Sequence, residues 1–392
     1  MREFIDGATA VARGALDAGC DFFAGYPISP ATSLLLHMIR ELPRCGGVAI
    51  QTEDEIAAIS MCIAAAMTGR RALTATSGPG ISLYSENIGL AIMGEAPLVI
   101  VDVQRLGPAT GGATTPGQGD VQFVRWGTAG GYPIIALAPG SVADCYSLTR
   151  RAFDLAERFR VPVFLLADKE MFLSMNTVEL DRYEHPPVRP RAMAPADLAG
   201  PYAPYRPGPD HAPPLFSPIG GPHIVRFTGS SHDEWGFLTK DPAAVGRLNE
   251  HLWRKIEDHR AELELAQADL EDSAQTLFIA YGITARAMAE AVRRCRAAGR
   301  PISALTVQSL WPTPEQAILH SLFGPAGDGP VARVVVAELN PGDFRREVER
   351  VIYRWAAQTR RPAPQIIGVN RVDGELITPE QLMAASQEPE RS

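Results

Sequence analysis

Apolar runs alternate with amphipathic patterns over the first part of the chain. The apolar runs predict strands at Asp21–Gly25, Val48–Gln51, Ala72–Thr76, Leu98–Val103, Ile134–Ala138 and Val161–Ala167. Runs without polar alternation are typical of strands that are buried on both faces. The segments between them have helical spacing, and they predict helices at Ala31–Leu42, Glu55–Thr68 and Ala143–Phe159. This order predicts βα units around a parallel sheet, in a domain of residues 1–180.

The same alternation returns later in the chain. Its apolar runs predict strands at Leu277–Tyr281, Ile302–Val307, Arg333–Glu338 and Gln365–Val369. Helical spacing predicts helices at Ala285–Ala298, Thr313–Phe323 and Asp343–Trp355. These elements predict a second, smaller α/β domain of residues 276–385. A polar helical pattern from Pro242 to Glu271 comes before it and predicts a linking helix over residues 246–275.

Residues 181–245 separate the two patterns and have little periodicity. They contain the proline pairs Pro186–Pro187 and Pro213–Pro214, and this proline density excludes regular helices and central strands. We expect an extended connector that lies over the surface of the first domain. The alternative is a loop that covers a site, with His232–Asp233–Glu234 as the segment to test.

Composition narrows the class of protein. With 392 residues the chain exceeds the roughly 250–300 residues that one core supports, so two domains are expected. A net charge of -8 without a basic block argues against nucleic-acid binding. The 5 cysteines never occur in C-x-x-C spacing, which predicts neither disulfides nor a zinc or iron–sulfur ligand set. No apolar run reaches the ~18 residues of a membrane span, so we expect no membrane partner and a cytoplasmic location.

Polar or flexible residues follow four predicted strands, where open α/β sheets bind ligands. In the first group, Gly25–Pro30, two prolines fix a turn, and Ser29 either caps the next helix or directs its hydroxyl into the crevice. The second group is a run of acids that begins a helix. Glu55 shares a helical face with Ile59 and Cys62 and is expected to point inward. A buried carboxylate without a partner is costly, so a ligand is expected to meet it.

The third group, Thr76–Gly80, has two glycines that permit close approach to the backbone. It lacks the third glycine of a dinucleotide site and the lysine of a mononucleotide site, so neither is predicted. The fourth group is the loop Gln104–Asp120, which is rich in glycine and threonine. Its Arg105 follows a buried strand and suits bidentate capture of a carboxylate or phosphate. The alternative is an ion pair between Arg105 and Asp102 or Asp120.

Together these motifs resemble one known family. The matching segments are Tyr26–Pro30, Glu53–Ala58, Thr74–Gly80, Gln104–Arg105, Gly107–Gly111, Arg125–Thr128, Leu310–Pro312, Val336–Asn340 and Gly368–Glu375. In this order they resemble the alpha subunit of 2-oxoacid:ferredoxin oxidoreductases, especially the 2-oxoglutarate type. The resemblance covers nearly the whole chain.

The resemblance implies a pyrimidine-type thiamine diphosphate domain followed by a domain similar to the transketolase C-terminal domain. It gives the catalytic role to Glu55, which would hydrogen-bond the aminopyrimidine ring and stabilise its imino tautomer. The implied substrate-binding residues are Ser29, Arg105, Thr110 and Thr114. The implied cofactor-binding residues are Tyr26, Pro27, Ile28, Glu55, Gly78 and Pro79, with none for a metal.

The implied reaction is oxidative decarboxylation of 2-oxoglutarate to succinyl-CoA, with electrons passed to ferredoxin and coenzyme A as co-substrate. Thiamine diphosphate would be shared with a beta subunit that carries Mg²⁺ and a 4Fe-4S cluster, and a gamma subunit is a further candidate partner. Gly327–Asp328–Gly329 mimics a diphosphate-binding signature and is interpreted as a turn. Alternatives are pyruvate or branched-chain specificity, a non-catalytic scaffold, and the beta chain of a lipoyl-linked 2-oxoacid dehydrogenase.

Overall fold

The computed structural model describes residues 2–182, 187–323 and 330–387, so Gly327–Asp328–Gly329 lies outside the described residues. The elements of the first part of the chain are β1 (Glu3–Ile5), α1 (Gly7–Asp17), β2 (Phe22–Gly25), α2 (Thr32–Glu41), β3 (Val48–Gln51), α3 (Glu55–Met67), β4 (Ala72–Thr76), α4 (Pro79–Leu83), α5 (Ser85–Met93), β5 (Leu98–Gln104), α6 (Val121–Trp126), β6 (Ile135–Leu137), α7 (Val142–Phe159), β7 (Pro162–Asp168), α8 (Lys169–Leu173) and β8 (Asn176–Val178). Short 3-10 helices lie at Leu42–Cys45, Leu180–Arg182 and Pro209–His211. The elements that follow are α9 (Pro242–Glu257), α10 (Arg260–Leu263), β9 (Ala266–Asp269), β10 (Thr276–Tyr281), α11 (Thr284–Ala297), β11 (Ser303–Val307), β12 (Ser309–Trp311), α12 (Glu315–Ser321), β13 (Arg333–Glu338), α13 (Arg345–Thr359), β14 (Gln365–Asn370) and α14 (Pro379–Ala385).

A seven-stranded sheet forms the first domain, in the order β12-β6-β7-β5-β4-β2-β3. All of its strands except β12 run parallel. The six strands predicted from the apolar runs of this domain are all present, with ends that differ by at most one residue. The prediction missed β1 and β8, which form a separate antiparallel pair.

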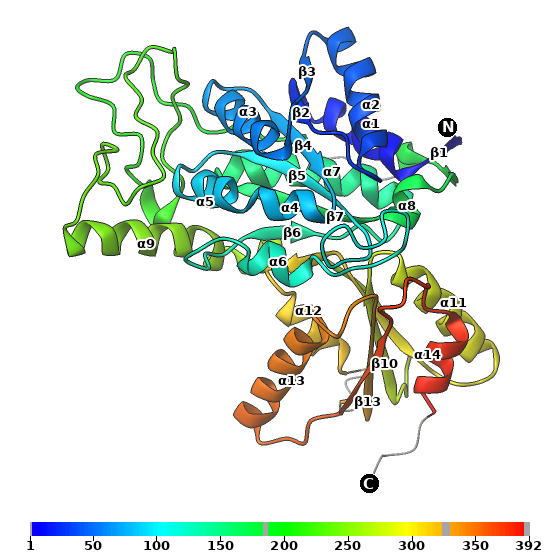
Figure 1. The fold of residues 1–392 in the computed structure, drawn as a ribbon. Helices are drawn as coiled ribbons and strands as arrows, with labels where there is room; N and C mark the ends of the chain where they lie inside the picture. Colours follow the sequence, from blue (N-terminus) through cyan, green and yellow to red (C-terminus); the bar gives the residue numbers. More distant parts are fainter. Residues whose placement is uncertain (1, 183–186, 324–329, 388–392) are drawn as a thin grey trace.

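Helices cover both faces of this sheet (Figure 1). Along β5, Val99, Val101 and Val103 pack with α1, α2, α7 and α8 in one core. Leu98 and Ile100 of the same strand pack with α3, α5 and α6 in the other core. Because both faces are buried, the strand sequences show no polar alternation.

The second domain contains a five-stranded sheet in the order β14-β13-β10-β11-β9. The four strands predicted for this domain are present and parallel, while β9 is an antiparallel edge strand on β11. The predicted helix from Pro242 to Glu271 is wrong beyond Glu257, where α9 ends. The chain then makes the short helix α10 and turns into β9. Pairing with β11 overrides the local helical pattern there, because strand formation depends on neighbouring strands.

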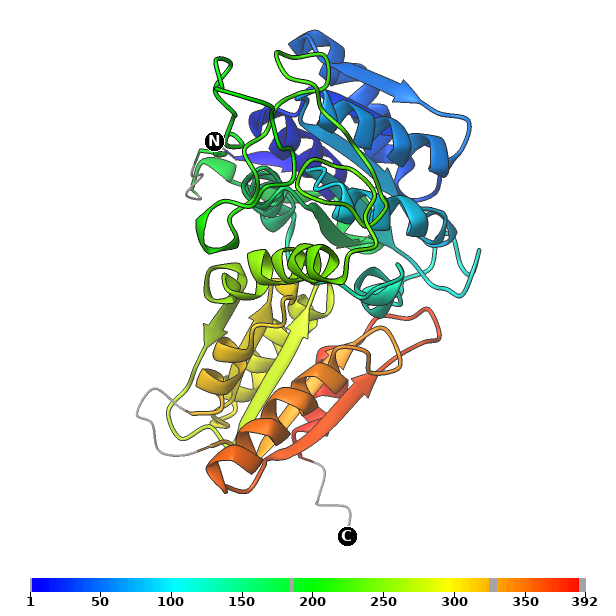
Figure 2. The same ribbon diagram turned by 90° about the vertical axis from the view of Figure 1, so that its left-hand side faces the viewer.

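The two domains share a sheet and a connector. The short strand β12 follows β11 in sequence, yet it pairs with β6 of the first domain. The indole nitrogen of Trp311, in β12, donates to the carbonyl of Val121 at 3.0 Å. The described part of the connector, residues 187–241, runs over the first domain on the side of α9 (Figure 2). Buried Arg191 holds it there by donating to the carboxylate of Glu157 and the carbonyl of Ala66.

A buried ion cluster joins α9 to the first domain. The ammonium of Lys255 lies 2.9 Å from the carboxylate of Glu95, and both side chains are at most 1% exposed. His251 lies 3.2 Å from the same carboxylate oxygen. Burial raises the pKa of Glu95, but Lys255 and His251 outweigh burial and hold that pKa below its usual range. The ion pair of Lys255 and Glu95 therefore anchors α9 only while both side chains are present.

We expect Lys255→Met to lower the free energy of unfolding by about 3–5 kcal/mol, because it leaves an uncompensated carboxylate in the core. Denaturant unfolding of the purified chain checks this. The double variant Lys255→Met/Glu95→Gln should recover part of the loss. Arg293→Met, which breaks an exposed pair with Glu290, should leave the midpoint unchanged. A Lys255→Met midpoint equal to that of the parent would contradict the proposed anchor.

Candidate functional site

The polar loops singled out from the sequence meet at one edge of the seven-stranded sheet. They follow β2, β3, β4 and β5, which are parallel neighbours or near neighbours in the sheet. The carboxyl ends of parallel strands lie at the same edge, and α/β sheets bind ligands there. The fold therefore brings the four predicted groups together.

Glu55 is the first residue of α3 and points inward as predicted. Asp54 caps the helix, because its carboxylate accepts from the backbone N–H of Ala57 at 2.7 Å. Glu55 is 7% exposed, whereas Glu53 is exposed. A side chain on Gly80 would place its Cβ 2.9 Å from Oε1 of Glu55. Glycine at this position therefore makes room for the Glu55 carboxylate.

Arg105 lies beside the same glycine-containing turn and is 4% exposed. Its guanidinium donates to the backbone carbonyls of Ser29 and Thr110, the latter at 3.2 Å. Gly78 has a φ of 51°, and a Cβ there would lie 2.9 Å from Nε of Arg105. Only glycine adopts this backbone conformation readily and leaves space for the guanidinium. The Thr76–Gly80 turn thus supports both charged side chains.

Two alternatives from the sequence are settled by these contacts. Arg105 forms no ion pair with Asp102 or Asp120 in the described structure, because its hydrogen bonds go to carbonyl groups. Ser29 does not cap the next helix, since α2 begins at Thr32 after Ala31, which makes no side-chain cap bond. The cap prediction failed because the turn after β2 is longer than a cap at Ser29 requires.

A cavity of about 580 Å³ opens between the two domains beside Arg105. Of the predicted site residues, Gly78, Pro79 and Arg105 line it. The other predicted residues lie outside its lining: Tyr26, Pro27, Ile28, Ser29, Glu55, Thr110 and Thr114. Thr110 contributes its carbonyl to Arg105, while Thr114 is exposed and makes no hydrogen bond to described residues. The structure therefore gives the loop hydroxyls no contact with this cavity.

The sequence reasoning missed the contribution of the second domain to this cavity. Its wall from that domain consists of Leu339, Asn340, Pro341, Asp343 and Val372. Gln118 docks the first domain against this wall, because its side-chain oxygen accepts from the N–H of Leu339 at 2.9 Å. Its amide also donates to Asp168 at 3.1 Å. Asn340 and Val372 occur in the motifs quoted above, but only the tertiary contact places them at the site.

Buried carboxyl groups surround Arg105 and the domain junction. Burial and the charge of Asp120 raise the pKa of Asp102 well above its usual range. Burial also raises the pKa of Asp120 to about 6, although Asp102 and Arg105 lower it. Burial raises the pKa of Asp168 to about 7, despite the N–H of Ile283 and the amide of Gln118. Asp120 and Asp168 therefore change protonation near neutral pH.

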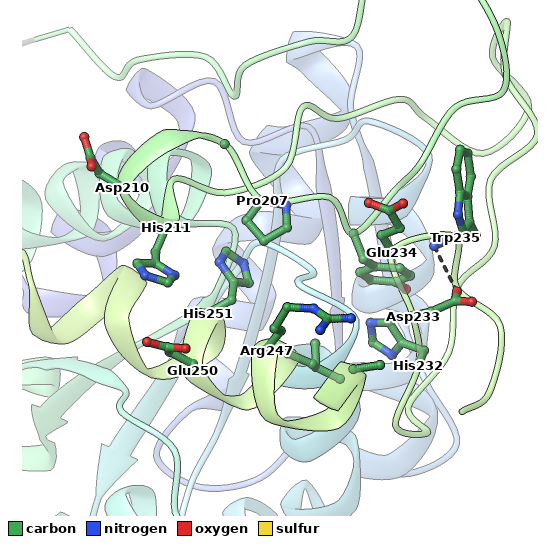
Figure 3. Close-up of a pocket in the computed structure, with 14 residues that line it drawn as sticks. Pro207, Asp210, His211, His232, Asp233, Glu234, Trp235, Arg247, Glu250 and His251 are labelled. Atoms are coloured by element: carbon green, nitrogen blue, oxygen red, sulfur yellow. Dashed lines mark hydrogen bonds between the residues drawn. The ribbon is translucent and has the colours of Figure 1, made fainter. Parts of the chain in front are cut away.

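A larger cavity, of about 670 Å³, lies between the connector and α9 (Figure 3). The buried imidazoles of His232 and His251 line it together with Arg247. None of its lining residues belongs to the loops that follow β2 to β5. The segment His232–Asp233–Glu234 therefore borders this cavity and not the cavity beside Arg105. This arrangement favours the connector interpretation over a loop that covers the site.

The described residues contain neither a metal-ligand cluster nor a membrane-spanning helix. Within the described residues, no group of three or more His, Cys, Asp or Glu side chains is placed to hold a metal ion. The cysteines are free thiols, and all except Cys45 are buried. No helix in the described part of the chain is long and apolar enough to cross a membrane.

Comparisons with known proteins agree with this architecture. The family model for the pyruvate flavodoxin/ferredoxin oxidoreductase thiamine diphosphate-binding domain matches residues 13–244, and that for pyruvate:ferredoxin oxidoreductase core domain II matches residues 274–382. The 2-oxoglutarate synthase subunit KorA of Methanocaldococcus jannaschii is 38% identical over 98% of both chains. The ketoisovalerate oxidoreductase subunit VorB of Methanothermobacter thermautotrophicus is 33% identical over 96% of this chain and 94% of its own.

One solved structure shares the fold of this chain over nearly its full length. It is the 2-oxoglutarate:ferredoxin oxidoreductase from Magnetococcus marinus with 2-oxoglutarate, coenzyme A and succinyl-CoA bound, with a TM-score of 0.87 and 29% identity. The match covers 98% of this chain and 65% of that chain. The predicted fold class, a thiamine diphosphate-type parallel-sheet domain followed by a smaller α/β domain, is confirmed. The chain belongs to the thiamine diphosphate-dependent 2-oxoacid:ferredoxin oxidoreductase family.

Proposed function

We propose that this chain is the alpha subunit of a 2-oxoglutarate:ferredoxin oxidoreductase, which converts 2-oxoglutarate to succinyl-CoA and passes electrons to ferredoxin. The observation that carries it is the placement of Glu55 and Arg105 around the Thr76–Gly80 turn at the ligand-binding edge of the sheet. The KorA relative and the Magnetococcus marinus enzyme are both named for this substrate. Membership of the 2-oxoacid:ferredoxin oxidoreductase family argues against the beta chain of a lipoyl-linked dehydrogenase. The buried charges of Glu55 and Arg105 are costly, which argues against a non-catalytic scaffold.

Residues at the strand ends fit the pyrimidine end of thiamine diphosphate. The Glu55 carboxylate has no hydrogen-bond donor among the described residues, although it is 7% exposed. The hydroxyl of Thr76 is buried next to it without a partner. Buried polar atoms of this kind are normally satisfied, so a bound ring with polar edges suits them. Tyr26, Pro27 and Ile28, at the end of β2, would pack beside that ring. Thiamine diphosphate, when bound, supplies the electron sink for decarboxylation.

The two charged residues would then have separate roles. Glu55 would hold a proton at the pyrimidine nitrogen that faces it, which is general acid–base chemistry by a positioned carboxyl group. Arg105 would bind the carboxylate of the 2-oxoacid, because its charge is held in place by two neutral carbonyl groups. None of the hydroxyls of Ser29, Thr110 and Thr114 lines the cavity, so they would reach the substrate only if the turn after β2 or the loop after β5 moves.

Substrate-dependent viologen reduction by the purified complex tests the proposed function. We expect 2-oxoglutarate to give the highest kcat/KM, with pyruvate and 2-oxoisovalerate as competitors. The VorB relative makes 2-oxoisovalerate the informative comparison. A higher kcat/KM for 2-oxoisovalerate would replace the proposed substrate with a branched-chain one. The absence of viologen reduction with all three 2-oxoacids would contradict the proposed function.

Other components are proposed on separate chains. A beta subunit would supply Mg²⁺, the diphosphate site and the 4Fe-4S cluster, with ferredoxin as electron acceptor and a gamma subunit as a further candidate. Coenzyme A would be the acyl acceptor, and the complex would act in the cytoplasm. The chain itself matches the thiamine diphosphate-binding and core domain II models.

The chain purified alone is expected to contain no iron and to have no decarboxylase activity. The reason is that it has neither a cysteine ligand set nor a diphosphate motif. Metal analysis and viologen reduction, each compared with the complex that includes the beta subunit, check this. Iron–sulfur absorbance in the isolated chain would contradict the proposed division of the enzyme.

A further inference from the structure

Two carboxyl groups meet beside Arg105 in the wall of the inter-domain cavity. Asp102, within β5, is 0% exposed, and neither of its oxygens receives a hydrogen bond from a described residue. Asp120, just before α6, lines the cavity, and its Oδ2 is also buried without a donor. The two carboxyl groups lie within hydrogen-bonding reach of each other. Two ionised carboxylates this close and this buried would repel strongly, so one proton must lie between them.

Arg105 is close enough to act on both carboxyl groups, yet it pairs with neither. Its positive charge lowers the pKa of Asp102 and of Asp120. Its hydrogen bonds go to the carbonyls of Ser29 and Thr110, and its Nε is buried without a partner. A guanidinium bonded to neutral acceptors keeps its full charge for an incoming anion.

Apart from Glu55, the other groups around the pair are neutral or already paired. On the strands beside β5, the residues in register with Asp102 are Thr76 and Leu166, which carry no charge. Tyr84, between α4 and α5, is neutral because burial raises its pKa. Glu55 acts on Tyr84 from α3 and is the other acid on this side. Across the cavity, Asp343 is paired with Arg346 at 3.1 Å.

We propose that Asp102 and Asp120 are a positioning pair that shares one proton and sets the net charge that a 2-oxoacid meets at Arg105. The proposal rests on the proposed function, because it takes Arg105 as the group that binds the substrate carboxylate. It adds a role for two residues that make no ion pair and no helix cap.

The pair has a definite effect on substrate affinity. The pKa of Asp120 is about 6, so below about pH 6 the pair takes up a second proton and becomes neutral. The cavity wall then carries the positive charge of Arg105 alone. Above that pH the pair carries one negative charge, which partly cancels Arg105. The affinity for a 2-oxoacid should therefore fall as pH rises through about 6.

An infrared experiment tests the shared proton without turnover. The complex is measured at pH 7.5 as the parent and as Asp102→Asn, which keeps the side-chain volume and lets the amide donate to Asp120. The parent spectrum should contain one C=O stretching band of a protonated carboxyl group that is absent from the Asp102→Asn spectrum. Asp258→Asn, at an exposed position after α9, serves as the control and should lose no such band. The proposal would be overturned if the parent and Asp102→Asn showed the same carboxyl bands.

Steady-state kinetics of the complex tests the effect on substrate. Asp120→Asn removes the negative charge and breaks no cap, because the Asp120 side chain caps no N–H group. We expect its KM for 2-oxoglutarate at pH 7.5 to fall on the order of tenfold, the effect of one nearby unit charge in a partly screened site. Its KM should also lose the rise through about pH 6 that the parent shows. A raised KM, or an unchanged pH profile, would overturn the proposal.

The two experiments separate this inference from the proposed function. If none of the 2-oxoacids supports viologen reduction by the complex, the proposed function fails. The infrared band still decides whether the proton is shared. If 2-oxoglutarate is turned over but the Asp102→Asn spectrum loses no carboxyl band, the function stands and the pair is refuted.

Discussion

Glu55→Gln is expected to assemble into the complex and to lower kcat for 2-oxoglutarate by at least ~10²-fold, the usual contribution of general acid–base catalysis. Gln keeps the volume of the side chain beside Gly80 and leaves the helix cap from Asp54 intact. It loses only the ability to take or hold a proton at the ring nitrogen. Viologen reduction by the reconstituted complex gives kcat, and hydrogen–deuterium exchange at the thiazolium carbon of the bound cofactor reports the proton transfer directly.

Glu53→Gln is the matched control, because Glu53 lies two residues before Glu55 and is exposed. We expect it to retain both turnover and exchange. If Glu53→Gln abolished exchange while Glu55→Gln retained it, the catalytic role would move to Glu53 and the assignment from burial would be wrong. Circular dichroism and co-purification with the beta subunit show whether a loss of activity comes from a loss of folding.

Arg105→Lys should raise the KM for 2-oxoglutarate by about tenfold or more, the typical strength of one lost charge-assisted hydrogen bond. Lysine keeps the charge but has no planar fork, so it cannot hold both the Ser29 and Thr110 carbonyls and still present a bidentate face. The ammonium would also leave empty the space that Gly78 provides for the guanidinium. Initial rates of viologen reduction over a range of 2-oxoglutarate concentrations measure the effect.

Arg293→Lys is the control for this substitution, since Arg293 is exposed on α11 and pairs with Glu290 at the surface. Its KM should equal that of the parent. Unchanged kinetics in Arg105→Lys would mean that the guanidinium supports the loop and does not bind substrate. A fall in kcat at unchanged KM would place Arg105 in a later step.

The sequence by itself determined most of the fold and the position of Glu55 and Arg105 at the ends of buried strands. Six strands of the first domain were readable because continuous burial on both faces leaves unbroken apolar runs. The inward direction of Glu55 followed from helical periodicity, and its exposure of only 7% agrees with that prediction. These features depend on the spacing of apolar and polar residues within short segments, and the sequence gives that spacing directly.

Only the tertiary structure decided which groups meet across the site. It turned the end of the expected linking helix into β9, and it carried β12 into the sheet of the other domain. It gave Arg105 two carbonyl partners and excluded the alternative of an ion pair with an acid, and it set Asp102 against Asp120. Such contacts join residues far apart in sequence, and their free energy comes from shared burial and geometry that no local pattern records.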